Sequence, residues 1–182
     1  MKTRQFVRRT RIAAPVERVF GWHEAPGALE RLTPPGEPVR MVRQSGGIKD
    51  GGQVELAIGR WPFSIRWISE HSAYIENRQF RDIQVRGPFT RWEHTHLFEP
   101  DGSGACYLED RIEYALPFGF AGRWLAGRII ERKLNRLFQY RHRITRDCGE
   151  HPAVFVRSSF ALPPSGARLP HFSRELGINA RA

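Results

Sequence analysis

The chain has few cysteines and no long apolar run, and both absences narrow its class. Cys106 and Cys148 are the only cysteines among 182 residues, too few for a disulfide framework. No stretch approaches about 18 consecutive apolar residues, so we expect no membrane-spanning helix. The first 14 residues are basic but lack the apolar segment of a secretory signal. These features favour a cytoplasmic protein, and the length suits one main domain.

Motifs for nucleic acids, dinucleotides and metals are also missing. The net charge of +10, from 29 Lys and Arg against 19 Asp and Glu, would permit nucleic acid or an anionic membrane as a partner. No helix-turn-helix spacing, RNP-type aromatic pattern or zinc-finger ligand set accompanies it, so we expect no specific nucleic-acid partner. The sequence also lacks a strand–GxGxxG–helix start, an HExxH motif and paired cysteines. We therefore expect no cofactor and no bound metal.

Alternation of apolar and polar residues predicts mostly strands. Residues 6–12 show this period of two, which is typical of a strand with one buried face. Turns rich in glycine and proline separate six later segments of the same kind: 39–44, 54–58, 63–67, 80–86, 90–98 and 106–116. Seven strands joined by short turns indicate one antiparallel meander.

Helical spacing is found at two places. After residues 6–12, an amphipathic helix follows Pro15, and after Pro26-Gly27 residues 28–32 make one more short turn. The longest helix is expected at 121–145. Its inner stripe is Trp124, Leu125, Ile129, Ile130, Leu134, Leu137, Phe138, Arg141 and Ile144, and its outer face carries Arg123, Arg128, Arg132, Lys133, Arg136 and Arg143. We expect residues 1–146 to form the domain and the proline-containing residues 147–182 to form an extended or disordered tail.

A row of polar side chains is predicted on the inner face of the sheet. A hairpin turn at Gly87-Pro88 pairs Asp82 with His94. If Phe98 lies opposite Cys106, then His94 also lies opposite Asp110. Asp82, His94 and Asp110 would then stand side by side across three strands, and we call them the polar row.

The polar row has a structural and a functional interpretation. The three groups could satisfy one another in a buried face, or they could contact a ligand, with His94 as an acid or base held by a carboxylate. His94 and His96 also have a spacing that can chelate zinc, but no signature supports a metal. On the long helix, Arg141 needs a carboxylate or a ligand anion if it is buried. His23 is expected to be a core residue.

A curved sheet covered by a long helix and two short helices is expected to enclose a cavity. Apolar walls with a few convergent polar groups are usual for small-molecule pockets. Ile130 and Leu134 would add to its walls. The predicted ligand-binding residues are Asp82, Gln84, Trp92, His94, His96, Phe98, Asp110, Ile112, Tyr114, Phe138 and Arg141.

The pattern of residues resembles a known superfamily. The similarity lies in Trp22-His23, Pro26-Gly27-Ala28-Leu29, Leu32-Thr33-Pro34-Pro35, Phe80, Asp82, Gln84, Gly87-Pro88-Phe89, Trp92, His94, His96, Phe98, Asp110, Tyr114, Pro117 and Tyr140-Arg141-His142. Over residues 4–146 the chain is similar to the START-like superfamily, also called SRPBCC or polyketide cyclase/dehydrase-like. The resemblance implies an α+β helix-grip fold: a curved antiparallel sheet of about seven strands, two short helices and one long C-terminal helix around a cavity. The superfamily includes lipid carriers, ligand sensors and cyclases.

These observations lead to one expected function and two alternatives. We expect the protein to bind a hydrophobic small molecule, such as a lipid, a quinone or a polyketide-like compound, as a carrier or sensor. One alternative is a cyclase or dehydratase acting on a polyketide-like substrate, with His94, Asp82 and Asp110 as candidate catalytic residues. The other is a module that docks on a partner or weakly on an anionic membrane through the basic face of the long helix. The Trp61-Pro62-Phe63 tip could form an exposed apolar lip at a pocket mouth or a membrane surface, but such a tip more often folds back onto the sheet edge, which is what we expect here.

Overall fold

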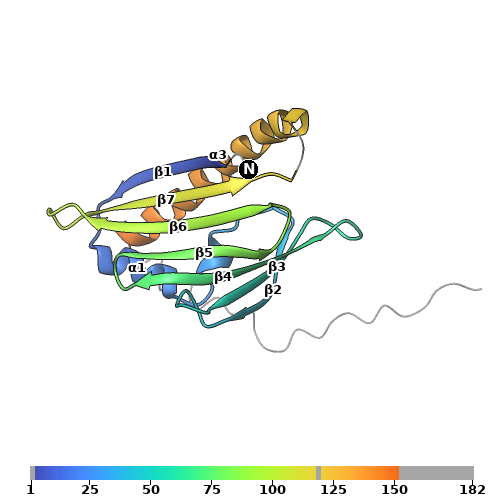
Figure 1. The fold of residues 1–182 in the computed structure, drawn as a ribbon. Coiled ribbons are helices and arrows are strands. Elements are labelled where there is room, and N and C mark those ends of the chain that lie inside the picture. The colour runs from blue at the N-terminus through green and yellow to red at the C-terminus, as the bar shows by residue number, and fades with distance from the viewer. Residues whose placement is uncertain (1–2, 118–119, 152–182) are drawn as a thin grey trace, which may run out of the picture.

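The protein folds as one curved antiparallel sheet gripped by helices, as expected. The computed structural model describes residues 3–117 and 120–151. Its sheet has seven strands in the order β1-β7-β6-β5-β4-β3-β2 (Figure 1). The strands are β1 (Arg4–Ile12), β2 (Val39–Ser45), β3 (Gln53–Ile58), β4 (Ile65–Ile75), β5 (Gln79–Arg86), β6 (Arg91–Pro100) and β7 (Cys106–Ala115). The helices are α1 (Val16–Glu24), α2 (Ala28–Arg31) and α3 (Phe120–Glu150). None of the helices in these residues is long and apolar enough to cross a membrane.

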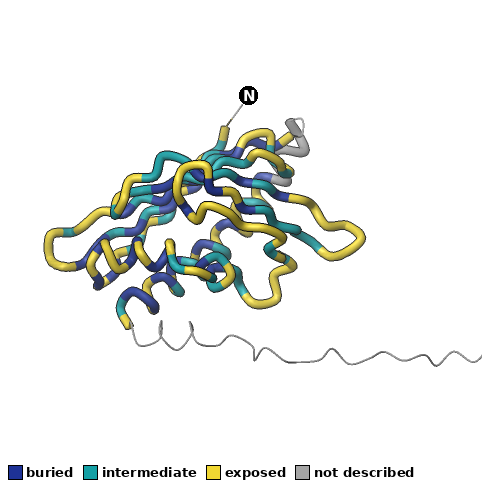
Figure 2. The backbone as a smooth tube through the Cα atoms, turned by 90° about the horizontal axis from the view of Figure 1, so that it is seen from below, coloured by how far each residue is buried: buried dark blue, intermediate teal, exposed yellow. Residues whose placement is uncertain are grey.

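Alternation along the central strands determines which face is buried. On β6 every second residue from Trp92 to Phe98 is buried, and on β7 the same holds from Cys106 to Tyr114. Successive side chains of a strand point to opposite faces, so these residues all line the inner face of the sheet. Figure 2 shows buried stretches on the strands and helices, while the loops at the ends are exposed.

Two apolar clusters pack on the inner face. One gathers around Phe20 of α1, and its members include Phe80, Phe98 and Leu108. The other gathers around Phe138 of α3, and its members include Phe6, Trp67, Trp92, Ile112, Tyr114 and Leu134. Burying each large side chain stabilises the fold by roughly 1.5–3 kcal/mol. The inner-face residues between the two clusters along β6 and β7 are His94, His96 and Asp110, and all three are polar.

The register of β6 against β7 differs from the prediction by two residues. Phe98 lies opposite Leu108 rather than Cys106, so Asp110 lies opposite His96 rather than His94. The turn explains the difference, because Asp101 Oδ1 accepts hydrogen bonds from the backbone N–H of Ser103 and Ala105. This turn makes Pro100 and Cys106 the closing pair.

The β5–β6 register matches the prediction at the polar row. Asp82 lies opposite His94, and Phe80 lies opposite His96. The paired residues of β5 and β6 end at Ile83 and Glu93, so the pairing of the two strands does not continue to the turn at Gly87-Pro88. There Thr90 donates its backbone N–H to Ala115 O at 2.9 Å instead.

Helix α3 is longer than predicted. It continues past the expected end near Thr145 to Glu150, and its last turn packs on the domain. Cys148 is buried with Trp22, and Glu150 Oε1 accepts a hydrogen bond from Ala13 N at 2.9 Å. Residues 147–150 therefore belong to the helix and not to a tail. The rest of the predicted tail, residues 152–182, lies outside the described residues.

Two other segments differ from the sequence-based expectation. Strand β4 begins at Ile65 and runs to Ile75, well beyond the expected end at Trp67. The loop before it does not fold back onto the sheet, because Trp61 is 89% exposed and Phe63 is 86% exposed. At the edge of the sheet, the pairing of β2 with β3 shifts between Met41 and Arg43.

Candidate functional site

Three adjacent strands and the long helix bring five titratable side chains together. Asp82 comes from β5, His94 and His96 from β6, Asp110 from β7 and His142 from α3. We call these five residues the buried polar cluster. His94, Asp110 and His142 are almost completely buried, as are the apolar residues around them. The cluster contains the whole predicted polar row together with His96 and one residue, His142, that was not predicted.

Asp110 lies at the centre of the buried polar cluster. Its Oδ1 atom is 2.8 Å from His94 Nε2, and its Oδ2 atom is 2.7 Å from His142 Nε2. An ionised carboxylate can only accept, so both nitrogens donate. The other ring nitrogen, His142 Nδ1, lies 2.7 Å from the hydroxyl oxygen of Thr10 on β1. This contact fixes α3 to the edge of the sheet that β1 forms. The arrangement of these groups links four elements around one carboxylate.

His96 is close to Asp110 without bonding to it. Its Nδ1 atom lies 2.7 Å from Asp110 Oδ1, but the geometry of this contact is not that of a hydrogen bond. The ring is held by apolar neighbours instead. Phe80 stacks on it with the ring centres 4.1 Å apart.

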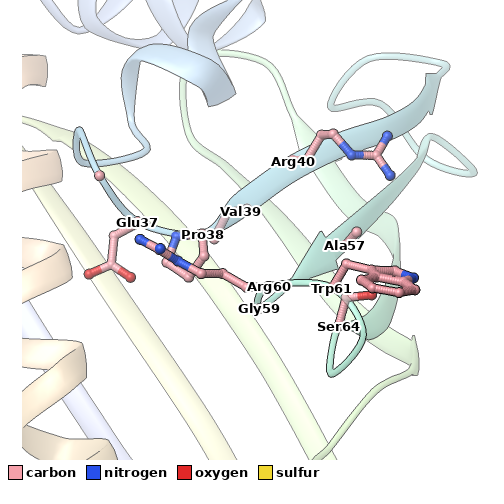
Figure 3. Close-up of a pocket in the computed structure, with 10 residues that line it drawn as sticks. Glu37, Pro38, Val39, Arg40, Ala57, Gly59, Arg60, Trp61 and Ser64 are labelled. Carbon is pink, nitrogen blue, oxygen red and sulfur yellow. The ribbon is translucent and has the colours of Figure 1, made fainter. Parts of the chain in front are cut away.

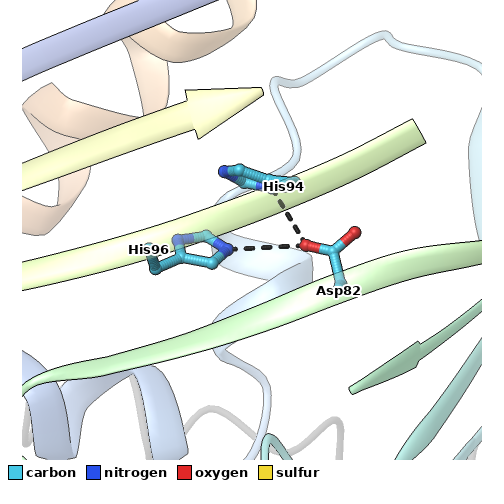
Figure 4. A group of neighbouring side chains, drawn as sticks. All are labelled: Asp82, His94 and His96. Atoms are coloured by element: carbon cyan, nitrogen blue, oxygen red, sulfur yellow. Dashed lines mark ion pairs between the residues drawn. The ribbon is translucent and has the colours of Figure 1, made fainter. Parts of the chain in front are cut away.

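Asp82 has the most exposed side chain of the five residues in the cluster. Its Oδ2 atom lies 2.9 Å from His94 Nδ1 and 3.6 Å from His96 Nε2 (Figure 4). The Asp82 side chain is 17% exposed, whereas that of Asp110 is 3% exposed. The site is therefore more open on the side of β5.

The two carboxylates hold His94 in its charged form. Burial lowers the pKa of His94, but the charges and hydrogen bonds of Asp82 and Asp110 outweigh it and raise the pKa to about 9. Burial raises the pKa of Asp82 and of Asp110, yet the neighbouring histidines hold both well below the usual value. The site thus contains ionised carboxylates and a protonated imidazole at neutral pH.

Two further buried histidines flank the cluster. His23 on α1 bonds through Nδ1 to Val19 O at 2.8 Å, and its ring centre lies 6.0 Å from that of His96. Burial lowers the pKa of His23 to about 3, so this ring stays neutral in the core, as expected for a core residue. His71 on β4 lies opposite Asp82 in the sheet, and burial lowers its pKa as well.

The predicted apolar site residues separate into two groups. Trp92, Ile112, Tyr114 and Phe138 belong to the cluster around α3, with Trp67 at 5.1 Å from Trp92 between ring centres. Phe98 belongs to the other cluster, against Phe20 of α1. The structure therefore places Phe98 on the opposite side of the polar groups from the remaining aromatic residues.

Two predicted polar residues bond to the backbone. Gln84 donates to Phe89 O at 2.8 Å and fixes the β5–β6 turn. Arg141 is half-buried and donates to Leu32 O at 3.3 Å, while its guanidinium lies over the Phe138 ring. Within the described residues, Arg141 forms no ion pair with a carboxylate, and the alternative partner, a ligand anion, stays a prediction. Burial lowers the pKa of Arg141, and the charges of Asp110 and Asp82 oppose this effect.

Sequence reasoning missed His142 and His71 for different reasons. Leu134, Phe138 and His142 are four residues apart and lie on one stripe of α3, so the helical spacing contains the signal. From the sequence we named Arg141, the residue before His142, as the polar member of the inner stripe and left His142 out. His71 was missed because β4 was expected to end at Trp67, and its burial depends on the longer strand.

Two hollows on the surface lie away from the buried polar cluster. The larger, a groove of about 480 Å³, is lined by the 36–40 segment and by the β3–β4 loop with Arg60 and Trp61 (Figure 3). The smaller, about 200 Å³, lies on the outer face of β5, β6 and β7. The enclosed cavity expected from the sequence is neither of these and stays a prediction.

The chain matches one protein family in a comparison with family models. Residues 12–141 match the model of the family described as "Polyketide cyclase / dehydrase and lipid transport". No curated protein sequence matches the chain.

Solved structures share the fold at low identity. The chain is similar to Zhui aromatase/cyclase from Streptomyces sp. R1128, with 14% identity, a TM-score of 0.64, and 84% of this chain and 96% of that chain covered. It is also similar to norcoclaurine synthase from Thalictrum flavum, with 16% identity, a TM-score of 0.62, and coverages of 82% and 88%. A nucleoside-diphosphate sugar epimerase from Corynebacterium glutamicum gives 22% identity and a TM-score of 0.63 over 85% of this chain, but only 30% of that chain. At such identities these likenesses show the fold alone.

Proposed function

Because the chain belongs to the polyketide cyclase/dehydrase and lipid transport family, we propose that it binds a hydrophobic small molecule as a carrier or sensor. The ligand would be a lipid, a quinone or a polyketide-like compound, held against the inner face of the sheet. The buried free cysteines support the expected cytoplasmic location.

The observation that carries this proposal is the buried polar cluster beside an aromatic wall. Removing charged groups from water costs several kcal/mol per ion, and a well-packed apolar core is often at least as stable. A need for stability alone therefore does not account for two carboxylates and three imidazoles at this position. Groups of this kind can orient the polar end of a ligand.

The two parts of the site would contact different parts of the ligand. Asp82 faces the more open side of the cluster and would bind the polar end. Trp67, Phe89 and Trp92 pack against one another: Phe89 lies edge to face with Trp67 and is tilted against Trp92, with the ring centres of Phe89 and Trp92 4.8 Å apart. They would contact the apolar body of the ligand.

Mass spectrometry of the purified protein tests the proposal. Native spectra should show a bound species, and organic extraction should release a lipophilic compound. The Asp82→Asn variant should retain less of it, by about tenfold, since one buried charged hydrogen bond to the ligand is weakened. Glu93→Gln on the outer face of β6 is the matched control and should retain as much as the parent. Equal retention by Asp82→Asn, or no bound species after expression in several lipid-rich hosts, would contradict the proposal.

A second candidate function is catalysis of a cyclisation or dehydration. The protonated His94 between Asp82 and Asp110 favours it, because an imidazolium can give a proton to a departing hydroxyl group. Incubation with a polyketide-like β-hydroxy ketone would test this, with loss of water followed by mass spectrometry. His94→Gln keeps a hydrogen-bond donor but no acid, so it should abolish the reaction and leave binding largely intact.

A third candidate is contact with an anionic membrane. The exposed aromatic tip favours it more directly than the basic helix face, because Trp61 and Phe63 project beside Arg60. This would let a carrier exchange its ligand at a bilayer.

A further inference from the structure

The buried polar cluster has the composition of a transition-metal site. The ligand atoms of Asp82, His94 and His96 all lie within 4.8 Å of one another. Two imidazole nitrogens and one carboxylate oxygen are a ligand set that zinc and similar divalent ions accept. The three residues come from the neighbouring strands β5 and β6, so their backbones are rigid (Figure 4).

The hydrogen bond of Asp110 determines which nitrogen of His94 could bind a cation. His94 Nε2 donates to Asp110, so a neutral His94 ring presents the Nδ1 lone pair toward Asp82. That lone pair faces Asp82 Oδ2 at 2.9 Å, and two acceptors at this distance repel each other. Either a second proton on the ring or a metal cation between the two atoms removes the repulsion.

His96 is placed to act as a second imidazole ligand of the cation. It has no hydrogen bond at Nδ1, and its Nε2 atom lies on the Asp82 side, 3.6 Å from Oδ2. With its proton at Nδ1, beside the Asp110 carboxylate, a neutral His96 ring presents the lone pair of Nε2 to a cation on the Asp82 side.

The distances are close to those that a metal requires. Tetrahedral zinc with bonds of about 2.0–2.1 Å separates its ligand atoms by roughly 3.4 Å. The two separations from Asp82 Oδ2 are 2.9 Å and 3.6 Å, and the three ligand atoms all lie within 4.8 Å, so side-chain rotations would have to bring them to the spacing of a metal site. The ionised carboxylates of Asp82 and Asp110 would also attract a divalent cation to this position.

The surrounding residues match the outer shell of known types of metal site. A metal-ligating histidine usually donates its other N–H to a carboxylate, which fixes the ring and its tautomer. Asp110 has this relation to His94, and His142 together with Thr10 holds Asp110 in turn. We propose that Asp82, His94 and His96 bind one divalent transition-metal ion of the zinc type, with Asp110 as the orienting carboxylate. This replaces our sequence-based expectation of no metal, and it does not depend on a hydrophobic ligand.

Metal titration of the chelator-treated full chain tests the site. Calorimetry with ZnCl₂ at pH 7.5 should give one ion per chain with a dissociation constant below about 10 μM. CoCl₂ should give the intense visible absorption of a four-coordinate site. Asp82→Asn and His96→Gln should each weaken zinc binding by about 100-fold or more, because each removes a ligand.

Matched controls separate this site from adventitious binding. Glu93→Gln removes a carboxylate from the other face of β6, and His151→Gln removes an exposed histidine, so neither should change the affinity. Zinc binding weaker than about 1 mM, or binding that survives both ligand substitutions, would overturn the proposal. If a variant fails to fold by circular dichroism, the cobalt spectrum of the parent decides. In that case, the pale spectrum of a hydrated six-coordinate ion would overturn it.

Discussion

His94 bridges the two carboxylates of the site. It lies 2.9 Å from Asp82 and 2.8 Å from Asp110, and nearly all of its surface is buried. Deleting its ring would leave two carboxylates close together in an apolar face. One of them would have to take up a proton, because like charges disfavour joint ionisation.

We expect His94→Ala to lower the free energy of unfolding by roughly 3–5 kcal/mol, the usual cost of removing one partner of a buried ion pair. His94→Gln keeps a donor and an acceptor and should recover part of the loss. Urea denaturation in the presence of a chelator measures both, so that metal binding does not contribute. A His94→Ala variant as stable as the parent would mean that the ring does not bridge the two carboxylates.

The raised pKa of His94 predicts a specific pH dependence. Its folded value of about 9 exceeds the ordinary value, so the folded state retains a proton that the unfolded chain releases. The stabilisation is complete below about pH 6.5 and is lost as the pH rises through 9, with a slope approaching about 1.4 kcal/mol per pH unit. Metal-free protein unfolded in urea between pH 6 and 10 should show this slope, and His94→Gln should flatten it. An unchanged slope in the variant would assign the proton to another group.

At the scale of elements, periodicity predicted the faces correctly but could not fix every register. Alternation put Asp82, His94 and Asp110 on the inner face, and all three are there. A slip of two residues preserves the face, so the pattern alone could not distinguish His94 from His96 as the partner of Asp110. That choice depended on the Asp101 turn, in which the Asp101 side chain bonds to backbone N–H groups two and four positions further along the chain.

The end of α3 is a second element that sequence reasoning placed incorrectly. The segment after Thr145 has no long apolar stripe, yet Cys148 and Gly149 lie against α1 and β1 because both are small. A Cβ on Gly149 would come within 3.2 Å of Ile12 Cγ2 and 3.3 Å of Val19 Cγ2. Close packing of this kind is invisible to a hydrophobic pattern.

Truncation tests the importance of this last turn. A chain ending at residue 145 should lose roughly 2–3 kcal/mol relative to one ending at 151, from the burial of Cys148 and the hydrogen bond between Glu150 and Ala13. Thermal unfolding of the two chains measures the difference. Identical melting temperatures would show that the last turn of α3 does not stabilise the domain.

At the scale of the whole molecule, positive charge and an exposed aromatic tip suggest a surface for anionic membranes. Trp61 and Phe63 lie in the β3–β4 loop, whereas the exposed Arg132, Lys133 and Arg136 lie on α3. The two surfaces can be tested separately, because they belong to different elements.

We expect binding to phosphatidylcholine vesicles that contain phosphatidylserine, and we expect salt to weaken it. Replacing Trp61 and Phe63 with alanine should reduce binding strongly if the tip inserts, and Arg132→Glu with Lys133→Glu should reduce it if the helix face docks. Sedimentation of the vesicles measures both, and vesicles of phosphatidylcholine alone are the control. Binding that neither pair of substitutions weakens would exclude both surfaces.

The shift in β2 has a consequence for solubility. The open sheet ends at β2, and an edge strand offers unpaired backbone groups to any other chain, which is a route to aggregation. Here the irregularity between Met41 and Arg43 interrupts the regular ladder, and the exposed Arg40 and Arg43 add like charges that two copies would have to bring together. Arg40→Thr with Arg43→Val should therefore increase light scattering of concentrated protein at low salt while its melting temperature stays the same. We therefore expect the β2 edge to limit pairing between copies of this highly basic protein.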